Sequence, residues 1–452
     1  MTTYAPYPAA LRETRARLGL SSVVVGAAVA ILHAPLAIAM RHWDILATAH
    51  ALATLLACIA IGIFSRRAVY VLGAMSYIAG AEVLWRMCKA SIFWEFGKYS
   101  VCLLLIIALF RLKELRLPKL ALLYFALLLP ACLKTVLGFG IAGAVGQISF
   151  DLSGPLTLLL ALCFLRNVSM TRTDLTGVLA SVLPPTLGIA AIALSTSYGA
   201  EIRFTGASNK ALSGGFGPNQ VASALALGAL AALWIVFTAR PTGVRKLALI
   251  ALSLGLYAQS AITFSRSGVY LTGTSVLVAI LMLSSDRRYR GVILSSMLVL
   301  VVGAAVVLPL ANSFTGGHLL TRFQRKDITN RDVLMFQDLS LWQAYPFFGA
   351  GVGNSDFVHW KGVAAHTEYT RLLAEHGTLG LFALASLLLV AYGRWRRYQG
   401  QLEKAFVVSM FGWFFLYIGV NGMRLVAPIF VLGLGYAQWK LAAPRAATVR
   451  ER

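Results

Sequence analysis

The stretch AAHTEYTRLLAEHGTLGLF, residues 364–382, places acid–base side chains directly before an apolar run. His366, Glu368, Arg371, Glu375 and His376 fall within eleven residues of a chain that is 58% hydrophobic and only 13% charged. A neutral imidazole near a membrane border is suited to taking a proton from a hydroxyl group. His366 is therefore the candidate general base, and Glu368 and Arg371 are candidate supporting residues.

Two other histidines compete with His366 for this role. His318 lies further upstream, and His376 stands beside Gly377, a candidate helix C-cap. A histidine at that position favours the end of a helix electrostatically, so we expect His376 to serve the helix terminus rather than the chemistry.

The forty Lys and Arg residues are divided between two kinds of position. Twenty-five lie in the termini and in short loops that alternate along the chain, which is the positive-inside pattern of cytoplasmic loops and not a nucleic-acid footprint. The other fifteen lie on the opposite side or within apolar runs, where a cation is costly and suggests function. For Arg41, Lys98 and Lys134, the favoured interpretation is a side chain that reaches lipid phosphates.

Arg266 is the most conspicuous of these fifteen cations. It lies in QSAITFSRSGVYLTG, between two apolar runs joined too tightly for a solvated loop, and small neighbours (Ser265, Ser267 and Gly268) could let a phosphate approach the backbone. Arg203 lies in a loop that ends at Pro218, a predicted helix start of the kind that attracts anions. Because arginine binds phosphate bidentately and stays charged, Arg203 and Arg266 are predicted to hold a lipid-linked diphosphate.

Weaker candidates surround this predicted diphosphate site. Arg86 is one, although Glu82 four residues earlier offers an intrahelical ion pair as an equally good explanation. Lys89, Asn219 and Arg331 complete the set of supporting candidates. No acidic pair of the DxD type occurs in the outside loops, so we predict no metal site and no cofactor.

The elements that must position these residues are membrane helices. Runs of about 20 apolar residues recur along the 452-residue chain, which predicts an all-α polytopic membrane protein with both termini cytoplasmic. Up to fourteen runs are candidates, and we expect twelve to fourteen crossings. The five cysteines lie in or beside these runs without CxxC spacing, so they are expected to be core residues.

The longest soluble stretch divides the chain into three parts. We expect a helix bundle over 1–312, an outside loop with helices over 313–377, and further helices with a cytoplasmic tail over 378–452. Within the loop, NRDVLMFQDLSLWQAY is predicted to be helical with Asn330 as its N-cap, and HTEYTRLLAEHG is predicted to be a second helix ending at Gly377.

Four motifs, in order, resemble the superfamily of O-antigen ligases, O-antigen polymerases and O-oligosaccharyltransferases. They are GGFGPNQVA at 214–222, TFSRSGV at 263–269, RDVLMFQDLSLWQAYPFFGAGVGN at 331–354, and HTEYTRLLAEHGTLGL at 366–381. The resemblance covers roughly the C-terminal half of the chain. Thr367 stands where the family usually has asparagine after the motif histidine.

The resemblance implies a GT-C-like glycosyltransferase in the Gram-negative inner membrane, with its site on the periplasmic side. It implies an undecaprenyl-diphosphate-linked glycan as donor and favours lipid A–core as acceptor, as in the ligases. His366 would be the base, Arg203 and Arg266 the diphosphate clamp, and a single metal-independent displacement would invert the anomeric carbon. The alternatives are an O-antigen polymerase, a protein O-oligosaccharyltransferase or, from another class, a transporter. A transporter would place paired charges near the midplane of two similar halves, which the sequence does not show.

Overall fold

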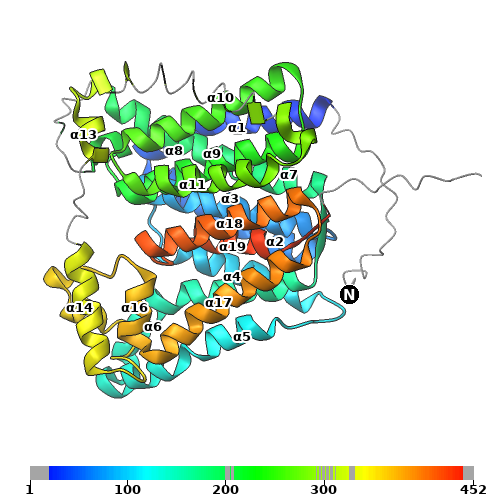
Figure 1. Ribbon diagram of the computed structural model, residues 1–452. Helices are drawn as coiled ribbons and strands as arrows, with labels where there is room; N and C mark the ends of the chain where they lie inside the picture. Colours follow the sequence, from blue (N-terminus) through cyan, green and yellow to red (C-terminus); the bar gives the residue numbers. More distant parts are fainter. Residues whose placement is uncertain are drawn as a thin grey trace, which may run out of the picture.

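The computed structural model describes residues 20–198, 204, 208–291, 293–294, 297, 301, 305, 309–310, 312–324 and 331–440. Most of these residues form helices that run side by side in one bundle (Figure 1). Eight segments among the described residues are long and apolar enough to cross a membrane. This confirms a helical protein with several membrane-spanning segments, while the expected count of twelve to fourteen crossings stays a prediction.

The first half of the described chain contains eight helices. They are α1 (Leu20–His42), α2 (Asp44–Phe64), α3 (Ala68–Met87), α4 (Phe96–Phe110), α5 (Lys119–Ala126), α6 (Leu129–Arg166), α7 (Arg172–Ala180) and α8 (Leu183–Ser197). The remaining helices are α9 (Pro218–Ala239), α10 (Gly243–Ile262), α11 (Arg266–Leu283), α13 (His318–Gln324), α14 (Arg331–Ala344), α15 (Ser355–Val358), α16 (Glu368–His376), α17 (Thr378–Arg397), α18 (Gln401–Val420) and α19 (Val426–Tyr436). Short 3₁₀ turns occur at Ala211–Ser213, Arg287–Tyr289 and Trp360–Gly362, and two short strands, β1 (Ser169–Thr171) and β2 (Gln438–Lys440), pair in parallel.

Helix α9 lies at the centre of the bundle because it is apolar on every face. Its residues from Val221 to Thr238 are all buried, and it packs against α3, α7, α8, α10 and α11. Alanine and glycine dominate this helix, which lets neighbouring backbones approach closely, as in membrane bundles generally. A β-carbon at Gly228 would lie 2.6 Å from the hydroxyl of Thr186 on α8.

A glycine divides α6 into two limbs. Gly140 has φ 68° and ψ 169°, a backbone conformation that is not helical and that glycine adopts without strain. The first limb contacts the glycine-rich turn at 349–353: Thr135 donates to the carbonyl of Val352 at 3.0 Å, and the amine of Lys134 donates to the carbonyl of Gly349 at 2.7 Å. The helix therefore bends where the sequence is richest in glycine, and it positions the segment that leads to α16.

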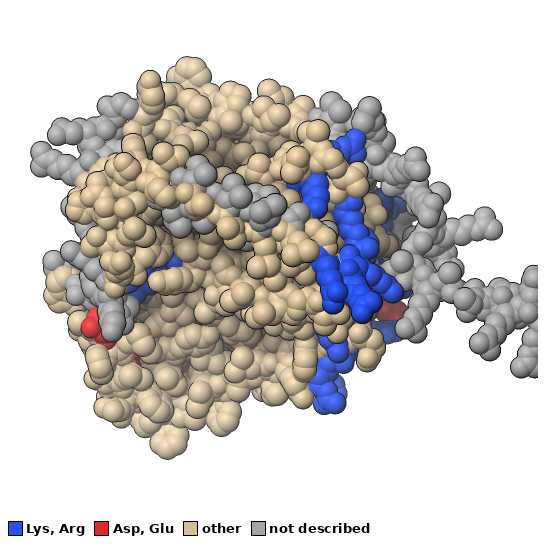
Figure 2. Space-filling view, turned by 45° about the horizontal axis from the view of Figure 1, so that its top comes forward, with Lys and Arg blue, Asp and Glu red and all other residues tan. Residues whose placement is uncertain are grey.

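The loops predicted to share one side do meet at one end of the bundle, here called the basic end. Arg67 forms a 2.7 Å ion pair with Asp174, and Arg111 donates to the carbonyl of Ser65 at 2.6 Å. Figure 2 shows a band of Lys and Arg side chains across the face in view, near one end of the molecule. The described residues of the basic end are those at 65–67, 111–119, 166–174, 240–246, 287–290 and 394–404.

The opposite end, here called the site end, receives the segments predicted to do chemistry. α9 and α11 both begin there and run toward basic loops, while α13, α14 and α16 lie beyond the spanning helices at the left of Figure 1. The described part of the predicted outside loop is thus mainly helical, as expected.

Candidate active site

His366 lies half-buried at the entrance to α16. Thr367 is the N-cap of that helix, since its hydroxyl accepts a hydrogen bond from the amide of Tyr369 at 3.3 Å. Threonine and asparagine both cap helices well, so either residue could begin a helix at this position. α16 ends at Gly377 with φ 62°, where a β-carbon would lie 2.6 Å from the backbone of Phe347. The predicted helix and its C-cap glycine are confirmed.

Arg371 is the centre of a buried acid–base cluster. Its guanidinium lies 2.6 Å from Glu375 and 3.3 Å from Asp151 on α6, and it also contacts the carboxylate of Glu368. The second oxygen of Glu375 accepts from Ser355 at 2.8 Å. All of these charged side chains are less than a tenth exposed.

This burial decides the roles that the sequence left open for Glu368 and Arg371. Glu368 also accepts from the backbone amide of Met423 at 3.2 Å. The two side chains therefore hold α16 against α6 and against the loop between α18 and α19. By holding α16, they also fix the entrance of this helix, where His366 lies.

Four arginines lie at the site end, and two of them, Arg331 and Arg424, lie close enough to His366 for their charges to act on it; we call the four the arginine cluster. Its members are Arg266, Arg322, Arg331 and Arg424. Arg266 and Arg331 are the first residues of α11 and α14. Burial, and then the charges of Arg266 and Arg322, lower the pKa of Arg331, so these three side chains share one region.

The other two members are fixed by backbone carbonyls. Arg322 donates to the carbonyl of Phe264 at 3.2 Å, just before Arg266 in the chain. Arg424 donates to the carbonyl of Ala365, the residue directly before His366. The cluster is thus built from α11, α13, α14 and the α18–α19 loop. It includes Arg424, which holds the backbone next to His366.

The arginine cluster and burial keep His366 neutral. Burial, followed by the charges of Arg331, Arg424 and His359, lowers the pKa of His366 from 6.5 to about 4. A low-dielectric site disfavours an imidazolium, and like charges disfavour it further. At neutral pH, His366 is therefore an uncharged base beside several cations, and the same cations would attract an anion.

His359 has the opposite charge state because of its partners. Its Nε2 lies 2.7 Å from Asp338 and its Nδ1 lies 2.8 Å from the carbonyl of Val363. Both partners can only accept hydrogen bonds, so both ring nitrogens donate and the ring is an imidazolium. Burial alone would lower the pKa of His359, but the hydrogen bond and charge of Asp338 outweigh it and raise the pKa. The other oxygen of Asp338 accepts from Thr370 at 2.6 Å, which joins α14 to α16.

Several predictions about single residues need correction. His376 is fully buried, and burial lowers its pKa to about 3, so it cannot serve the helix end as a cation. Gly268 does not open the backbone to phosphate: a β-carbon there would lie 2.5 Å from the carbonyl of Ala222 on α9. Lys98 is fully buried and therefore does not reach lipid phosphates.

The structure separates the remaining candidates into groups. Arg203 lies outside the described residues. Asn219, in the first turn of α9, accepts from the hydroxyl of Ser265 at 2.7 Å and so lies directly behind Arg266. Lys89 is exposed at the end of α3.

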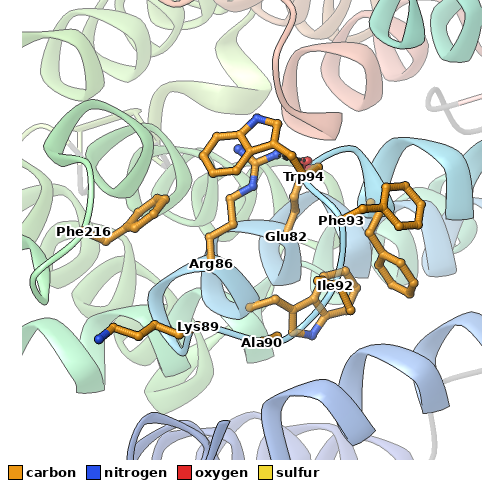
Figure 3. A pocket seen from close by; sticks show the side chains of 11 residues that line it. Glu82, Arg86, Lys89, Ala90, Ile92, Phe93, Trp94 and Phe216 are labelled. Carbon is orange, nitrogen blue, oxygen red and sulfur yellow. Dashed lines mark hydrogen bonds and ion pairs between the residues drawn. The ribbon is translucent and has the colours of Figure 1, made fainter. Parts of the chain in front are cut away.

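Arg86 forms an ion pair with Glu82 at 2.7 Å, which was one of the two interpretations that the sequence offered, and it stacks on Trp94 (Figure 3). It lies beside the aromatic cavity drawn there, which Glu82 and Lys89 also line. Arg86 and Lys89 therefore line this cavity, whereas Asn219 contacts Ser265, the neighbour of Arg266 in the chain.

Arg322 and Arg424 were not recognised as site residues from the sequence. Both were among the fifteen cations outside the basic loops, and Arg424 lies in NGMRLVAP, between two apolar runs, as Arg266 does. The signal that selected Arg266 could therefore have selected Arg424. Within the described part of the chain, no three His, Cys, Asp or Glu side chains are arranged to hold a metal ion.

The comparisons with known proteins add no identity. The chain matches no protein-family model and no curated protein at a significant level.

Proposed function

We propose that this protein is an O-antigen ligase. It transfers a glycan from undecaprenyl diphosphate to a sugar hydroxyl of lipid A–core. The observation that carries the proposal is a neutral, half-buried His366 beside the arginine cluster at one end of a membrane bundle. The order of the four motifs supports the same function. With the basic end in the cytoplasm, the site end faces the periplasm.

The arginine cluster suits a diphosphate leaving group. As the bond between the anomeric carbon and the diphosphate oxygen breaks, the electron pair and negative charge move to the diphosphate. Guanidinium groups already fixed by carbonyls stabilise that charge without reorganising. Arg322 and Arg424 are fixed in this way.

His366 suits the acceptor side of the reaction. The acceptor hydroxyl attacks the anomeric carbon, and its proton passes to the imidazole. The new glycosidic bond forms opposite the departing diphosphate, so a single displacement inverts the anomeric configuration. The buried acid–base cluster centred on Arg371 holds α16, which follows the histidine, and Arg424 holds the residue before it. Residues that hold a base in this way reduce the entropy cost of the reaction.

A strain that lacks the protein tests this proposal and separates it from its nearest alternatives. We expect the lipid A–core to lose long O-antigen while carrier-linked polymer accumulates. Complementation with wild type should restore ligation, whereas His366→Ala, expressed and inserted normally, should not. Core bearing a single O-antigen repeat would instead indicate a polymerase, and unchanged lipopolysaccharide with an unglycosylated protein would indicate an oligosaccharyltransferase.

A further inference from the structure

An aromatic cavity opens at the site end beside α3. It has a volume of about 300 Å³ and is lined by residues of α3, of the loop at 88–95, of α4 and of the turn before α9. Figure 3 shows Trp94 lying over Arg86, with Phe216 on one side of the cavity and Phe93 on the other. Glu82, Arg86 and Lys89 place charged groups among these aromatic side chains.

A rigid clamp holds Trp94 in place. The centre of the Arg86 guanidinium lies 4.0 Å from the centroid of the Trp94 ring, and Nη2 donates to the backbone carbonyl of Trp94 at 2.9 Å. Arg86 is itself fixed by Glu82 at 2.7 Å and by Gln220 at 3.1 Å. The other oxygen of Glu82 accepts from the amide of Val426 at 2.7 Å. The aromatic surface is therefore formed before any ligand arrives, which lowers the cost of binding.

Despite this clamp, the aromatic side chains keep much of their surface accessible. Trp94 is 44% exposed and Phe93 is 56% exposed. A tryptophan at a membrane boundary is common as an interfacial anchor. An anchor needs neither a charged clamp nor a cavity, however, and both are present here.

The clamp also connects this cavity to the candidate active site. Gln220 follows Asn219, whose side chain bonds Ser265 beside Arg266. Val426 lies two residues after Arg424, which binds the carbonyl before His366. The residues that hold the cavity in place therefore neighbour, in the chain, residues that contact the surroundings of Arg266 and of His366.

We infer that this cavity is a binding site for a pyranose ring of one of the two glycan substrates. The C–H groups on one face of a pyranose pack against the electron-rich face of an aromatic ring, while its hydroxyls bond charged or polar groups at the edge. The mixed lining of the cavity offers both kinds of contact. An alkyl chain would offer no hydrogen-bond partner to the amine of Lys89, which is exposed and also lines the cavity. The inference rests on the proposed glycosyltransferase function for the identity of its ligands.

The test compares tryptophans that differ in their relation to the cavity. The variant Trp94→Ala removes the platform but keeps the backbone carbonyl that Arg86 uses, and Trp94→Phe keeps an aromatic face. Trp43→Ala is the matched control, because Trp43 lies in the α1–α2 turn at the same end, is 62% exposed and does not line the cavity. Glycan transfer is measured with purified protein while the lipid-linked donor and the lipid A–core acceptor are varied in turn.

We expect Trp94→Ala to raise the KM of one substrate about tenfold, as expected for loss of one stacking contact, with little change in kcat. Trp94→Phe should recover most of this loss, and Trp43→Ala should behave like wild type. The substrate whose KM rises identifies the source of the sugar. Unchanged KM values for both substrates, or an equal effect of Trp43→Ala, would overturn the inference.

Direct binding separates this inference from the proposed function. Saturation-transfer NMR with delipidated core oligosaccharide and with free O-antigen glycan needs no transfer activity. If wild type transfers no glycan but binds one of these sugars, and only Trp94→Ala loses the signal, the cavity assignment stands and the proposed function fails. If wild type and Trp43→Ala bind neither sugar, the cavity assignment fails.

Discussion

The charge state of His366 should report directly on occupancy of the arginine cluster. In the free protein, burial and three cations hold its pKa at about 4. The fall of about 2.5 from the ordinary value corresponds to about 3 kcal/mol against the imidazolium form. Burial is the largest of the four causes, so it accounts for at least a quarter of this fall.

Because burial persists when an anion binds, the pKa of His366 can return only part of the way to its ordinary value. If a diphosphate neutralises Arg331 and Arg424, burial and the charge of His359 still act on His366, so its pKa should rise by about 1 to 2 and stay below the ordinary value. Arg331 is the second largest cause, so Arg331→Gln alone should raise the pKa by no more than about 1.2. Donor binding would thus make His366 a stronger base at the moment when a proton must be taken.

The assay is NMR titration of histidine-labelled protein in detergent, with His366 assigned from its absence in His366→Gln. Inorganic pyrophosphate serves as the probe anion. Arg331→Gln should start from a higher pKa and respond less to pyrophosphate. Arg41→Gln is the control, because Arg41 donates to the carbonyl of Met87 at the same end but is not a member of the arginine cluster. An ordinary pKa near 6.5 in free protein, or no response to pyrophosphate, would refute the reasoning.

Three further predictions concern stability. Arg371→Met leaves buried carboxylates without their cation and should cost about 3–5 kcal/mol of unfolding free energy, seen as a large fall in Tm; a fall like that of an exposed arginine variant would contradict the buried cluster. The His359–Asp338 pair should stabilise the protein fully below pH 6.5 and lose that contribution as pH rises through the raised pKa of His359. The Tm of His359→Gln should lack this pH dependence. A wild-type dependence of Tm on pH in that variant would disprove the pairing. Thr367→Ala should cost about 1 kcal/mol while Thr367→Asn is nearly neutral, and equal losses would exclude the capping role.

Much of the helical architecture follows from local sequence patterns. Apolar runs predicted the membrane helices because the bilayer core excludes unpaired backbone groups. The start of α9 at Pro218 and the end of α16 at Gly377 were predicted from cap chemistry. The i,i+4 spacing of Glu82 and Arg86 offered their ion pair as one of two equally good interpretations of Arg86, and the structure contains this pair. Each of these features depends on residues close together in the chain.

The features that the sequence did not predict depend on distant contacts. Asp151 meets Arg371 across 220 positions, and no local pattern links them. Gly268 was predicted to let a phosphate approach the backbone. It packs against α9 instead, and only the tertiary structure shows this contact. The charge of His359 and the neutrality of His366 likewise depend on which groups surround them. The candidate base could be named from the sequence, but its environment could not.

Glycan transfer by the purified protein is the most direct test of the proposed function. Undecaprenyl-diphosphate-linked O-antigen and lipid A–core are incubated with the protein in detergent, with and without EDTA. We predict a ligated product whose new bond has the inverted anomeric configuration and whose formation is unaffected by EDTA. His366→Ala and Arg266→Ala should lose transfer by about 10² or more while keeping the wild-type Tm. No product from wild type, or transfer at the wild-type rate by His366→Ala, would contradict the account.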